Sequence, residues 1–242
     1  MSDRRRVAIV TGGSRGLGRL IASVLAARGL QVVVGGRDTA ALEETASALK
    51  AAGGTATTVA GDITNAEVRA RLVLAAEEFG GLDILVNNAS ELGPMGPLMQ
   101  LDVTRLGRVF PVNAGAPLAL IQLGVPLLAE RGGLIVNITS DAATGAYPGW
   151  GPYGASKAAL ELLTRTLAIE LQEMGVSAVI VDPGDMRTRM HQEAFPGQDI
   201  SDRPLPEVTV PFWNWLFDQN PEELRGHRFC AQQQDAPWLQ PA

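Results

Sequence analysis

A tyrosine and a lysine lie four positions apart in the segment that runs from Tyr153 to Lys157. Apolar residues at helical spacing surround this segment, and residues four apart lie on the same face of a helix. A phenol has a pKa near ~10 and does not readily ionise at neutral pH, whereas an ammonium group beside it favours the phenolate. The pair therefore predicts a phenol that gives or takes a proton as a general acid or base. Because Tyr and Lys at this spacing are common by chance, the pair needs support from other parts of the sequence.

A glycine-rich segment over residues 11–18 follows an apolar β-branched run and precedes a helical pattern. Glycines in such a turn let the backbone bend tightly and approach a pyrophosphate, and the N-terminus of the following helix attracts phosphate groups. The segment therefore indicates a dinucleotide-binding turn. A plain structural loop is the alternative, since short glycine motifs also occur by chance. The cofactor-binding residues predicted here are Gly12, Ser14, Arg15, Gly16, Leu17 and Gly18.

The end of the second predicted strand bears on the choice of dinucleotide. An NAD site usually places a carboxylate there to bind the ribose hydroxyl groups. In this sequence Gly36 stands at that place, Arg37 follows it, and Arg15 lies inside the glycine turn. Guanidinium groups bind a phosphate through paired hydrogen bonds. The two arginines therefore favour NADP(H) over NAD(H), the alternative being two exposed surface arginines.

Short β-branched runs alternate with longer segments that carry apolar residues at helical spacing. Strands are predicted over Val7–Thr11, Gln31–Gly35, Thr55–Ala60, Leu82–Asn87, Leu134–Thr139, Val176–Val181 and Arg228–Gln232. Helices are predicted over Arg19–Arg28, Ala40–Ala51, Ala66–Phe79 and Gly154–Met174. Alternation of this kind is typical of βαβ units. We expect an α/β fold, a single doubly wound Rossmann-type domain over residues 1–242, with a central parallel sheet of about seven strands and helices on both faces.

Composition excludes several classes of partner. The net charge of −6 disfavours nucleic acid, which needs a basic surface. Cys230 is the only cysteine, so no intramolecular disulfide can form, and its neighbours predict a packed thiol in a buried strand. His191 and His227 have no Cys or acidic residue at ligand spacing, so no metal site is expected. With no apolar run near the ~20 residues that cross a bilayer, we expect a cytoplasmic protein without a membrane partner.

Proline and aromatic residues become frequent beyond about Asp185. Residues 185–225 are therefore predicted to form a loop and short helix that cover a substrate. The alternative is that Trp213 and Trp215 pack on the body of the domain or on another subunit, since large aromatic side chains dominate cores and interfaces.

Several motifs occur together in one order: the glycine turn, Asn87-Asn88-Ala89-Ser90, Asn113, Ser140, Tyr153 with Lys157, and Pro183-Gly184. Their order and spacing resemble those of the short-chain dehydrogenase/reductase family, over the range from about Val7 to Met190. The resemblance implies an NADPH-dependent oxidoreductase that transfers hydride between the nicotinamide and a carbonyl or alcohol substrate.

The same resemblance implies a role for each catalytic residue. Tyr153 would exchange a proton with the substrate oxygen, and Lys157 would lower the pKa of the phenol and bind the nicotinamide ribose. Ser140 would hydrogen-bond the substrate oxygen, stabilising the charge that builds there. Asn113 would hold a helix distortion and a water that links Lys157 to solvent.

The resemblance also assigns contacts with the cofactor beyond the glycine turn and Arg37. Asp62 and Ile63 match positions that contact the adenine. Further matches beside the ribose and nicotinamide are Asn88, Ala89, Tyr153, Lys157, Pro183, Gly184, Met186 and Thr188. A homotetramer or homodimer is implied, formed through helices around Asp102–Glu130 and Tyr153–Met174.

Two positions depart from the family pattern. Ser90 stands where the family has glycine, which we expect to be tolerated, and Pro111 lies two residues before Asn113. An interior proline either exaggerates the kink that the family uses or moves Asn113 out of position. Two other functions stay open: a non-catalytic NADP(H)-binding regulator on the same fold, and an NADPH-dependent reductase acting on C=C bonds.

Overall fold

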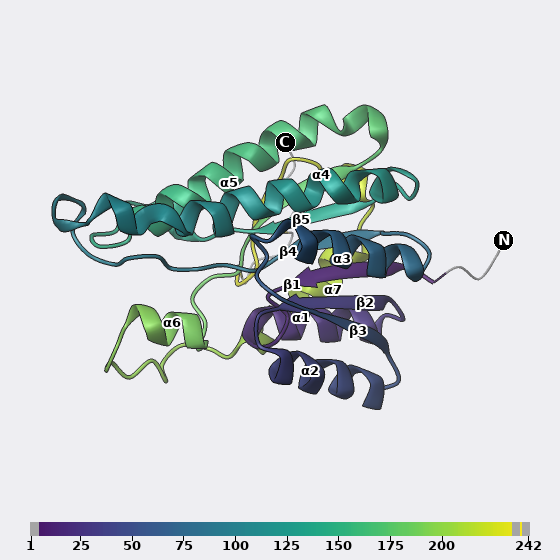
Figure 1. The fold of residues 1–242 in the computed structure, drawn as a ribbon, viewed down its shortest axis with the longest axis horizontal. Helices are drawn as coiled ribbons and strands as arrows, with labels where there is room; N and C mark the ends of the chain where they lie inside the picture. Colours follow the sequence, from purple (N-terminus) through teal and green to yellow (C-terminus); the bar gives the residue numbers. More distant parts are fainter. Residues whose placement is uncertain (1–4, 234–237, 239–242) are drawn as a thin grey trace.

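Seven strands, all paired in parallel, form the centre of the part of the chain that the structure describes (Figure 1). The structure is a computed structural model, and it describes residues 5–233 and 238. The order across the sheet is β3-β2-β1-β4-β5-β6-β7. The strands are β1 (Val7–Thr11), β2 (Gln31–Gly36), β3 (Thr55–Ala60), β4 (Ile84–Asn87), β5 (Leu134–Ile138), β6 (Ser177–Asp182) and β7 (Arg228–Cys230).

Helices cover both faces of the sheet. One face packs against α1 (Gly16–Ala27), α2 (Thr39–Ala51) and α7 (Val210–Asp218). The other packs against α3 (Ala66–Glu78), α4 (Ala116–Ala129) and α5 (Gly151–Glu170). Figure 1 shows α4 and α5 on one side of the strands and α1 and α2 on the other. Because both faces are covered, the strands are nearly continuous apolar runs, and the predicted doubly wound α/β class is confirmed.

Shorter elements connect or extend these layers. They are α6 (Arg189–Ala194), α8 (Pro221–Leu224), a π-helical turn at Pro111–Gly115, and 3-10 turns at Leu98–Gln100, Val103–Gly107, Asp141–Ala143, Gln172–Met174 and Pro206–Thr209. The helical stretch Val103–Ala129 has 27 residues and is long and apolar enough to cross a membrane, judged by an 18-residue window with a mean hydropathy of 1.6. Half of it is buried inside the domain, as the core helix of a folded domain also is.

The sheet reverses its winding between β1 and β4. The chain leaves β1 through α1 on one face and leaves β4 toward α4 on the other. The two connections therefore part at the carboxyl ends of neighbouring strands, and a crevice forms between them where open α/β sheets bind their ligands.

The expectation for Cys230 is wrong: its side chain is exposed. β7 is the edge strand of the sheet, and side chains alternate along a strand. Phe229 points into the core and is 2% exposed, which turns its neighbour Cys230 toward solvent.

Trp213 packs on the body of the domain. Its side chain is fully buried among the residues around α1, and its Nε1 donates a hydrogen bond of 2.8 Å to Thr209 Oγ1. Trp215 is partly buried, and its ring lies 5.5 Å from that of Phe229. These contacts anchor the second half of the segment 185–225 to the sheet.

The first turn of α5 passes so close to the 3-10 turn after β5 that a methyl group at Gly154 would overlap the carbonyl oxygen of Ala142. Overpacking of this kind costs about 1–3 kcal/mol, and alanine returns up to about 1 kcal/mol of helix propensity. We expect Gly154→Ala to lower the free energy of unfolding in urea by about 1–2 kcal/mol. Gly115→Ala is the control, because its nearest atom beyond the local chain is 3.8 Å away. Equal stability of the two variants would show that this close approach is not a constraint.

Candidate active site

A cleft of about 680 Å³ opens at the carboxyl ends of the central strands. All the cofactor-binding residues predicted from the sequence line it, as do Ser140, Tyr153 and Lys157. Asn113 is the exception among the predicted residues, because it is fully buried one layer behind the cleft wall. The structure therefore brings together residues from every part of the chain between Gly12 and Thr188.

The glycine turn has the shape that a dinucleotide pyrophosphate requires. Gly12 has a φ of +65°, and a Cβ there would lie 2.8 Å from Asn88 Nδ2. Asn88 holds the turn by donating hydrogen bonds to Thr11 O (2.9 Å) and Gly12 O (3.2 Å). Arg15 is the N-cap residue of α1, and its side chain makes no capping hydrogen bond to the first turn of that helix. The N–H groups of that turn can therefore bind phosphate oxygens, and the glycine turn fits the pyrophosphate of a dinucleotide.

Both arginines expected to favour a 2′-phosphate line the cleft, beside the end of β2. We call this part of the cleft the adenosine end, because the sequence predicts the adenosine there. Each is paired with an acid: Arg15 Nη2 lies 2.6 Å from Asp38 Oδ2, and Arg37 Nη1 lies 2.7 Å from Glu91 Oε1. Asp38 also caps α2 by accepting a hydrogen bond from the N–H of Ala41. The pairing of Arg37 could not be predicted from the sequence, because Arg37 follows β2 and Glu91 follows β4, 54 positions along the chain.

A third arginine, Arg108, joins the same group of charges. Its Nη2 lies 2.8 Å from Asp62 Oδ2 and 3.1 Å from Glu91 Oε1. The hydrogen bond that the N–H of Thr64 donates to Asp62 is the leading cause that lowers the pKa of that carboxyl to about 2, with help from Arg108. Asp62 is therefore ionised at all physiological pH values and fixes the loop after β3.

Tyr153 and Lys157 lie side by side in the first two turns of α5 and are both buried. Lys157 Nζ donates a hydrogen bond of 2.8 Å to Ile138 O, at the end of β5. The same atom lies 5.7 Å from the centroid of the Tyr153 ring. The predicted shared face is present, and a main-chain carbonyl holds the amine there.

Burial controls the proton affinities of this pair. It raises the pKa of Tyr153 to about 12, and the hydrogen bonds to Ser90 and Ser140 only partly oppose this effect. It lowers the pKa of Lys157 to about 7. Burial is thus the largest influence on the pKa of the phenol, and the expected lowering of that pKa by Lys157 stays a prediction. Near pH 7 the phenol is protonated and can donate a proton.

Two serine hydroxyls flank the phenol. Ser140 follows β5, donates to Asp141 Oδ1 (2.9 Å) and accepts from the N–H of Ala142 (3.1 Å). Ser90 follows β4 and donates to Asn113 Oδ1 (3.1 Å). Both hydroxyls act on the phenol of Tyr153 by lowering its pKa against the larger effect of burial. Ser90 was expected only to be tolerated, yet its hydroxyl adds a polar partner that glycine could not supply.

Asn113 holds the loop that carries Ser90. It lies in the π-helical turn Pro111–Gly115, the helix distortion expected at this point. Its Oδ1 accepts a hydrogen bond from Glu91 N (2.8 Å), and its Nδ2 donates to Glu91 O (2.8 Å) and Ser156 Oγ (2.9 Å). Pro111 opens this turn without moving the amide away from the loop.

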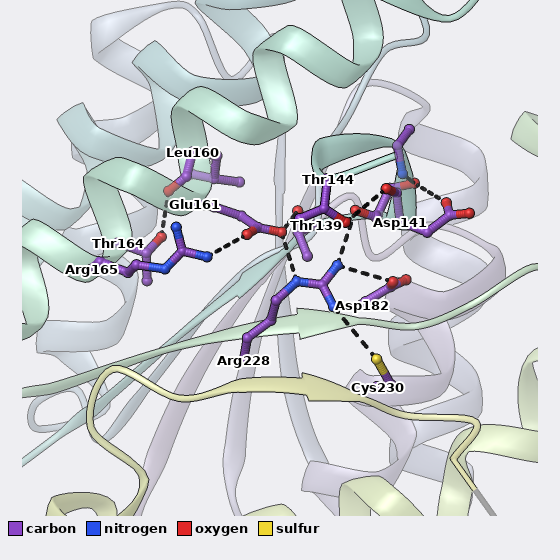
Figure 2. A network of polar contacts seen from close by, with 12 residues as sticks. Thr139, Asp141, Thr144, Leu160, Glu161, Thr164, Arg165, Asp182, Arg228 and Cys230 are labelled. Atoms are coloured by element: carbon purple, nitrogen blue, oxygen red, sulfur yellow. Dashed lines mark hydrogen bonds and ion pairs between the residues drawn. The ribbon is translucent and has the colours of Figure 1, made fainter. Parts of the chain in front are cut away.

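A buried ion-pair network, missed by sequence analysis, supports the loop of Ser140 from behind. Figure 2 shows Arg228 of β7 pointing to Glu161 of α5 and Asp182 of β6. Arg228 Nε lies 3.0 Å from Glu161 Oε1, and Nη2 lies 3.2 Å from Asp182 Oδ2 and 3.3 Å from Ser140 O. Thr139 Oγ1 also donates to Glu161 Oε1 (2.9 Å). The edge strand thereby fixes the end of β5 that carries Ser140.

Aromatic side chains line the other half of the cleft. The ring of Trp150 lies 5.8 Å from that of Tyr153 and 5.9 Å from that of Phe195 in the loop after α6. The ring centroid of His191 in α6 lies 4.9 Å from that of Phe195. Among the described residues, no group of His, Cys, Asp and Glu side chains is arranged to hold a metal ion. This half can therefore accommodate a partly apolar molecule beside Tyr153.

These features define a Rossmann-type fold with a glycine turn and a buried Tyr–Lys pair in its cleft. Residues 6–199 match the family model described as short chain dehydrogenase. An uncharacterized oxidoreductase from Mycobacterium tuberculosis is 38% identical over 187 residues, which cover 76% of this chain and 70% of that protein.

Solved structures agree with the sequence comparison. A protein from Pseudomonas syringae described as a short chain dehydrogenase has a TM-score of 0.88 and 36% identity, and the match covers 94% of both chains. A short chain dehydrogenase from Shigella flexneri, solved in complex with NADP, has a TM-score of 0.87 and 29% identity, covering 96% of this chain and 100% of that one. The chain therefore belongs to the short-chain dehydrogenase/reductase family of oxidoreductases, which bind a nicotinamide cofactor and act on small-molecule substrates.

The pKa of Tyr153 can be measured directly, because the chain has 2 tyrosines and Tyr147→Phe leaves one. Ordinary phenols, with a pKa near ~10, are about half ionised at pH 10. With its pKa raised to about 12, Tyr153 in the folded variant stays protonated at that pH. We expect almost no tyrosinate absorbance from the native variant at pH 10, and strong absorbance after unfolding in denaturant. Strong native absorbance at pH 10 would show that Lys157 does lower this pKa.

Removal of Arg228 should destabilise the protein. In Arg228→Met the carboxylates of Glu161 and Asp182 lose a partner, and breaking such a buried pair costs about 3 kcal/mol. The deficit should shrink as the pH falls toward 5, since burial already raises the pKa of Asp182 and protonation would remove the unpaired charge. Arg165→Met is the control, because Arg165 pairs with the same glutamate but is 49% exposed. Equal losses at pH 7 in the two variants would contradict this account.

Proposed function

We propose that the protein is an NADPH-dependent oxidoreductase that reduces a carbonyl group or oxidises the corresponding alcohol, with Tyr153 as the general acid and base. One observation carries the proposal: a buried phenol, protonated at neutral pH, lines the same cleft as a glycine turn that fits a pyrophosphate. The family match over residues 6–199 supports it.

The residues around the phenol divide the work. Bound nicotinamide supplies or accepts the hydride. Tyr153 donates the phenolic proton to the substrate oxygen in reduction and takes a proton from the hydroxyl group in oxidation. Ser140 hydrogen-bonds the same oxygen and stabilises the negative charge that develops there. Lys157 stands beside the phenol, where its ammonium form stabilises the phenolate left after transfer.

Asn113 and Ser90 act as positioning residues for this chemistry. The amide of Asn113 fixes the backbone of Glu91 and the hydroxyl of Ser90, and that hydroxyl in turn lowers the pKa of the phenol. The chain of contacts runs from the π-helical turn before α4 to the proton that is transferred. A displaced amide would leave the phenol with one hydroxyl partner fewer.

The preference for NADP(H) is proposed on the positions of Arg15 and Arg37, both of which line the adenosine end of the cleft. No acid follows β2 until Asp38, which caps α2. All the other predicted contacts line the same cleft: we propose that Asp62, Ile63, Asn88 and Ala89 bind the adenine and ribose, and that Pro183, Gly184, Met186 and Thr188 border the nicotinamide.

We also propose that residues 185–225 cover the substrate, because the first part of this segment, up to Phe195, lines the cleft while α7 anchors the later part. A homodimer or homotetramer is proposed on apolar side chains that α4 and α5 leave exposed, among them Leu123 (44%), Leu162 (65%) and Ile169 (75%). The proposed location is the cytoplasm, where the NADP pool is kept reduced.

Two other functions are less well supported. A non-catalytic NADP(H)-binding regulator would not need a buried Tyr–Lys pair flanked by two serines. A reductase acting on C=C bonds would use the same cofactor site, and only activity against ketones and enones in parallel separates it from a carbonyl reductase.

Tyr153→Phe tests the proton-donor role. We expect NADPH binding, followed by quenching of tryptophan fluorescence, to stay within about twofold while kcat falls by about 10²–10⁴ on a carbonyl panel. Thr166→Val, which removes a hydroxyl from the exposed side of the same helix, should keep full turnover. Substantial turnover by the phenylalanine variant would remove Tyr153 from the mechanism.

Arg37→Asp tests the cofactor preference. It replaces a phosphate partner by a carboxylate that can accept hydrogen bonds from ribose hydroxyls. Loss of a charge-assisted contact is expected to change the ratio of NADPH to NADH affinity by about tenfold or more toward NADH. Lys50→Asp, the same charge change at the end of α2, should leave the ratio unchanged. If both variants keep the wild-type ratio, Arg37 does not select the cofactor.

A further inference from the structure

A carboxylate stands between two arginines at the adenosine end of the cleft. Glu91 accepts from Arg37 Nη1 at 2.7 Å, and from Arg108 through Nη2 at 3.1 Å and Nε at 3.3 Å. The side chain of Glu91 is 20% exposed, against 65% for Arg37 and 55% for Arg108. The carboxylate of Glu91 is therefore the least exposed of the three groups, and the two guanidinium groups contact it from the solvent side.

The pair of Arg37 and Glu91 joins the end of β2 to the loop after β4. Both residues line the cleft, and the glycine turn after β1 lies between these two loops because β1 separates β2 from β4 in the sheet. An ion pair in this position spans the part of the cleft that an adenosine ribose would enter.

We propose that Glu91 is a positioning residue that sets cofactor specificity by competing with the 2′-phosphate of NADP(H) for Arg37. In the protein without cofactor, Glu91 holds Arg37. When the phosphate binds, Arg37 moves to it and Glu91 remains with Arg108. This inference rests on the proposed use of NADP(H).

The contacts favour this exchange of partners. Arg37 is bound to Glu91 by one nitrogen and is largely exposed, so its guanidinium can turn at little cost. Arg108 contacts the carboxylate through two nitrogens and is also fixed by Asp62 at 2.8 Å. Glu91 thus keeps a two-point partner after Arg37 leaves, and no carboxylate is left unpaired.

The backbone of Glu91 does not need to move. Its N–H and C=O are both hydrogen-bonded to the amide of Asn113, each at 2.8 Å. The exchange is therefore confined to side chains, and replacement of the carboxylate by an amide leaves the loop beside Ser90 in place.

The two nucleotides should respond differently to Glu91. A 2′-phosphate must break the pair of Arg37 and Glu91 and comes close to a like charge, so the carboxylate weakens NADPH binding. The unphosphorylated ribose of NADH brings no charge that needs Arg37, so its affinity is indifferent to Glu91. Because this ion pair is half exposed, we expect its loss to change the affinity for NADPH by about two- to fivefold.

Binding constants of wild type, Glu91→Gln and Glu78→Gln for NADPH and NADH test the proposal, read from tryptophan fluorescence on the full-length chain. We expect Glu91→Gln to bind NADPH about two- to fivefold more tightly, with no change for NADH. Glu78→Gln, an exposed residue of α3 remote from the cleft, should match wild type for both nucleotides. An unchanged ratio of NADPH to NADH affinity in Glu91→Gln overturns the proposal, as does an equal change for both.

A second variant keeps the test independent of one substitution. Arg108→Gln leaves Glu91 to Arg37 alone and should weaken NADPH binding, whereas in Glu91→Gln/Arg108→Gln most of that loss should disappear. A loss of the same size in both backgrounds would show that Arg108 acts without Glu91. Failure of the proposed function has a different signature: a wild-type protein that binds neither nucleotide, which would overturn this inference as well.

Discussion

Tyr153 and Lys157 share the start of α5 in a position where almost no water reaches either side chain, and the rest of the site depends on how they are held there. Burial raises the pKa of the phenol to about 12 and lowers that of the amine to about 7, so near neutral pH the phenol is protonated and the amine is close to its titration range. The carbonyl of Ile138 fixes the amine, and the hydroxyls of Ser90 and Ser140 lower the pKa of the phenol. Each of these three partners lies at or after the carboxyl end of β4 or β5.

The supports behind those partners come from distant parts of the fold. Arg228, on the last strand, bonds to the main chain at Ser140 and to the buried carboxylates of α5 and β6. Asn113, in a π-helical turn, fixes the loop of Ser90 and Glu91. Through Glu91 that loop also contacts the arginines of the adenosine end, so one short segment after β4 joins the two ends of the cleft.

Local patterns in the sequence predicted the parts of the structure that local physics determines. Strands buried on both faces are apolar runs, and six of the seven predicted strands begin within one residue of the observed ones. The exception is β4, which begins at Ile84 rather than Leu82 because Leu82 and Asp83 lie in the bend before the strand. The glycine turn and the Tyr153–Lys157 spacing are equally local. The partnerships of Glu91 and Arg228 join residues 54 and 67 positions apart, so no periodicity could indicate them. The prediction of a buried thiol at Cys230 was wrong because the exposure of this side chain depends on which strand lies at the edge of the sheet.

The proposed function requires that the phenol of Tyr153 face the reactive ring of a dinucleotide whose pyrophosphate lies on the glycine turn. A crystal structure of the protein with NADP⁺ measures this most directly. The account predicts a nicotinamide ring beside the Tyr153 hydroxyl and Ser140, with the ribose against Lys157. A ring bound away from Tyr153, or a hydroxyl that the bound molecule cannot reach, would contradict it.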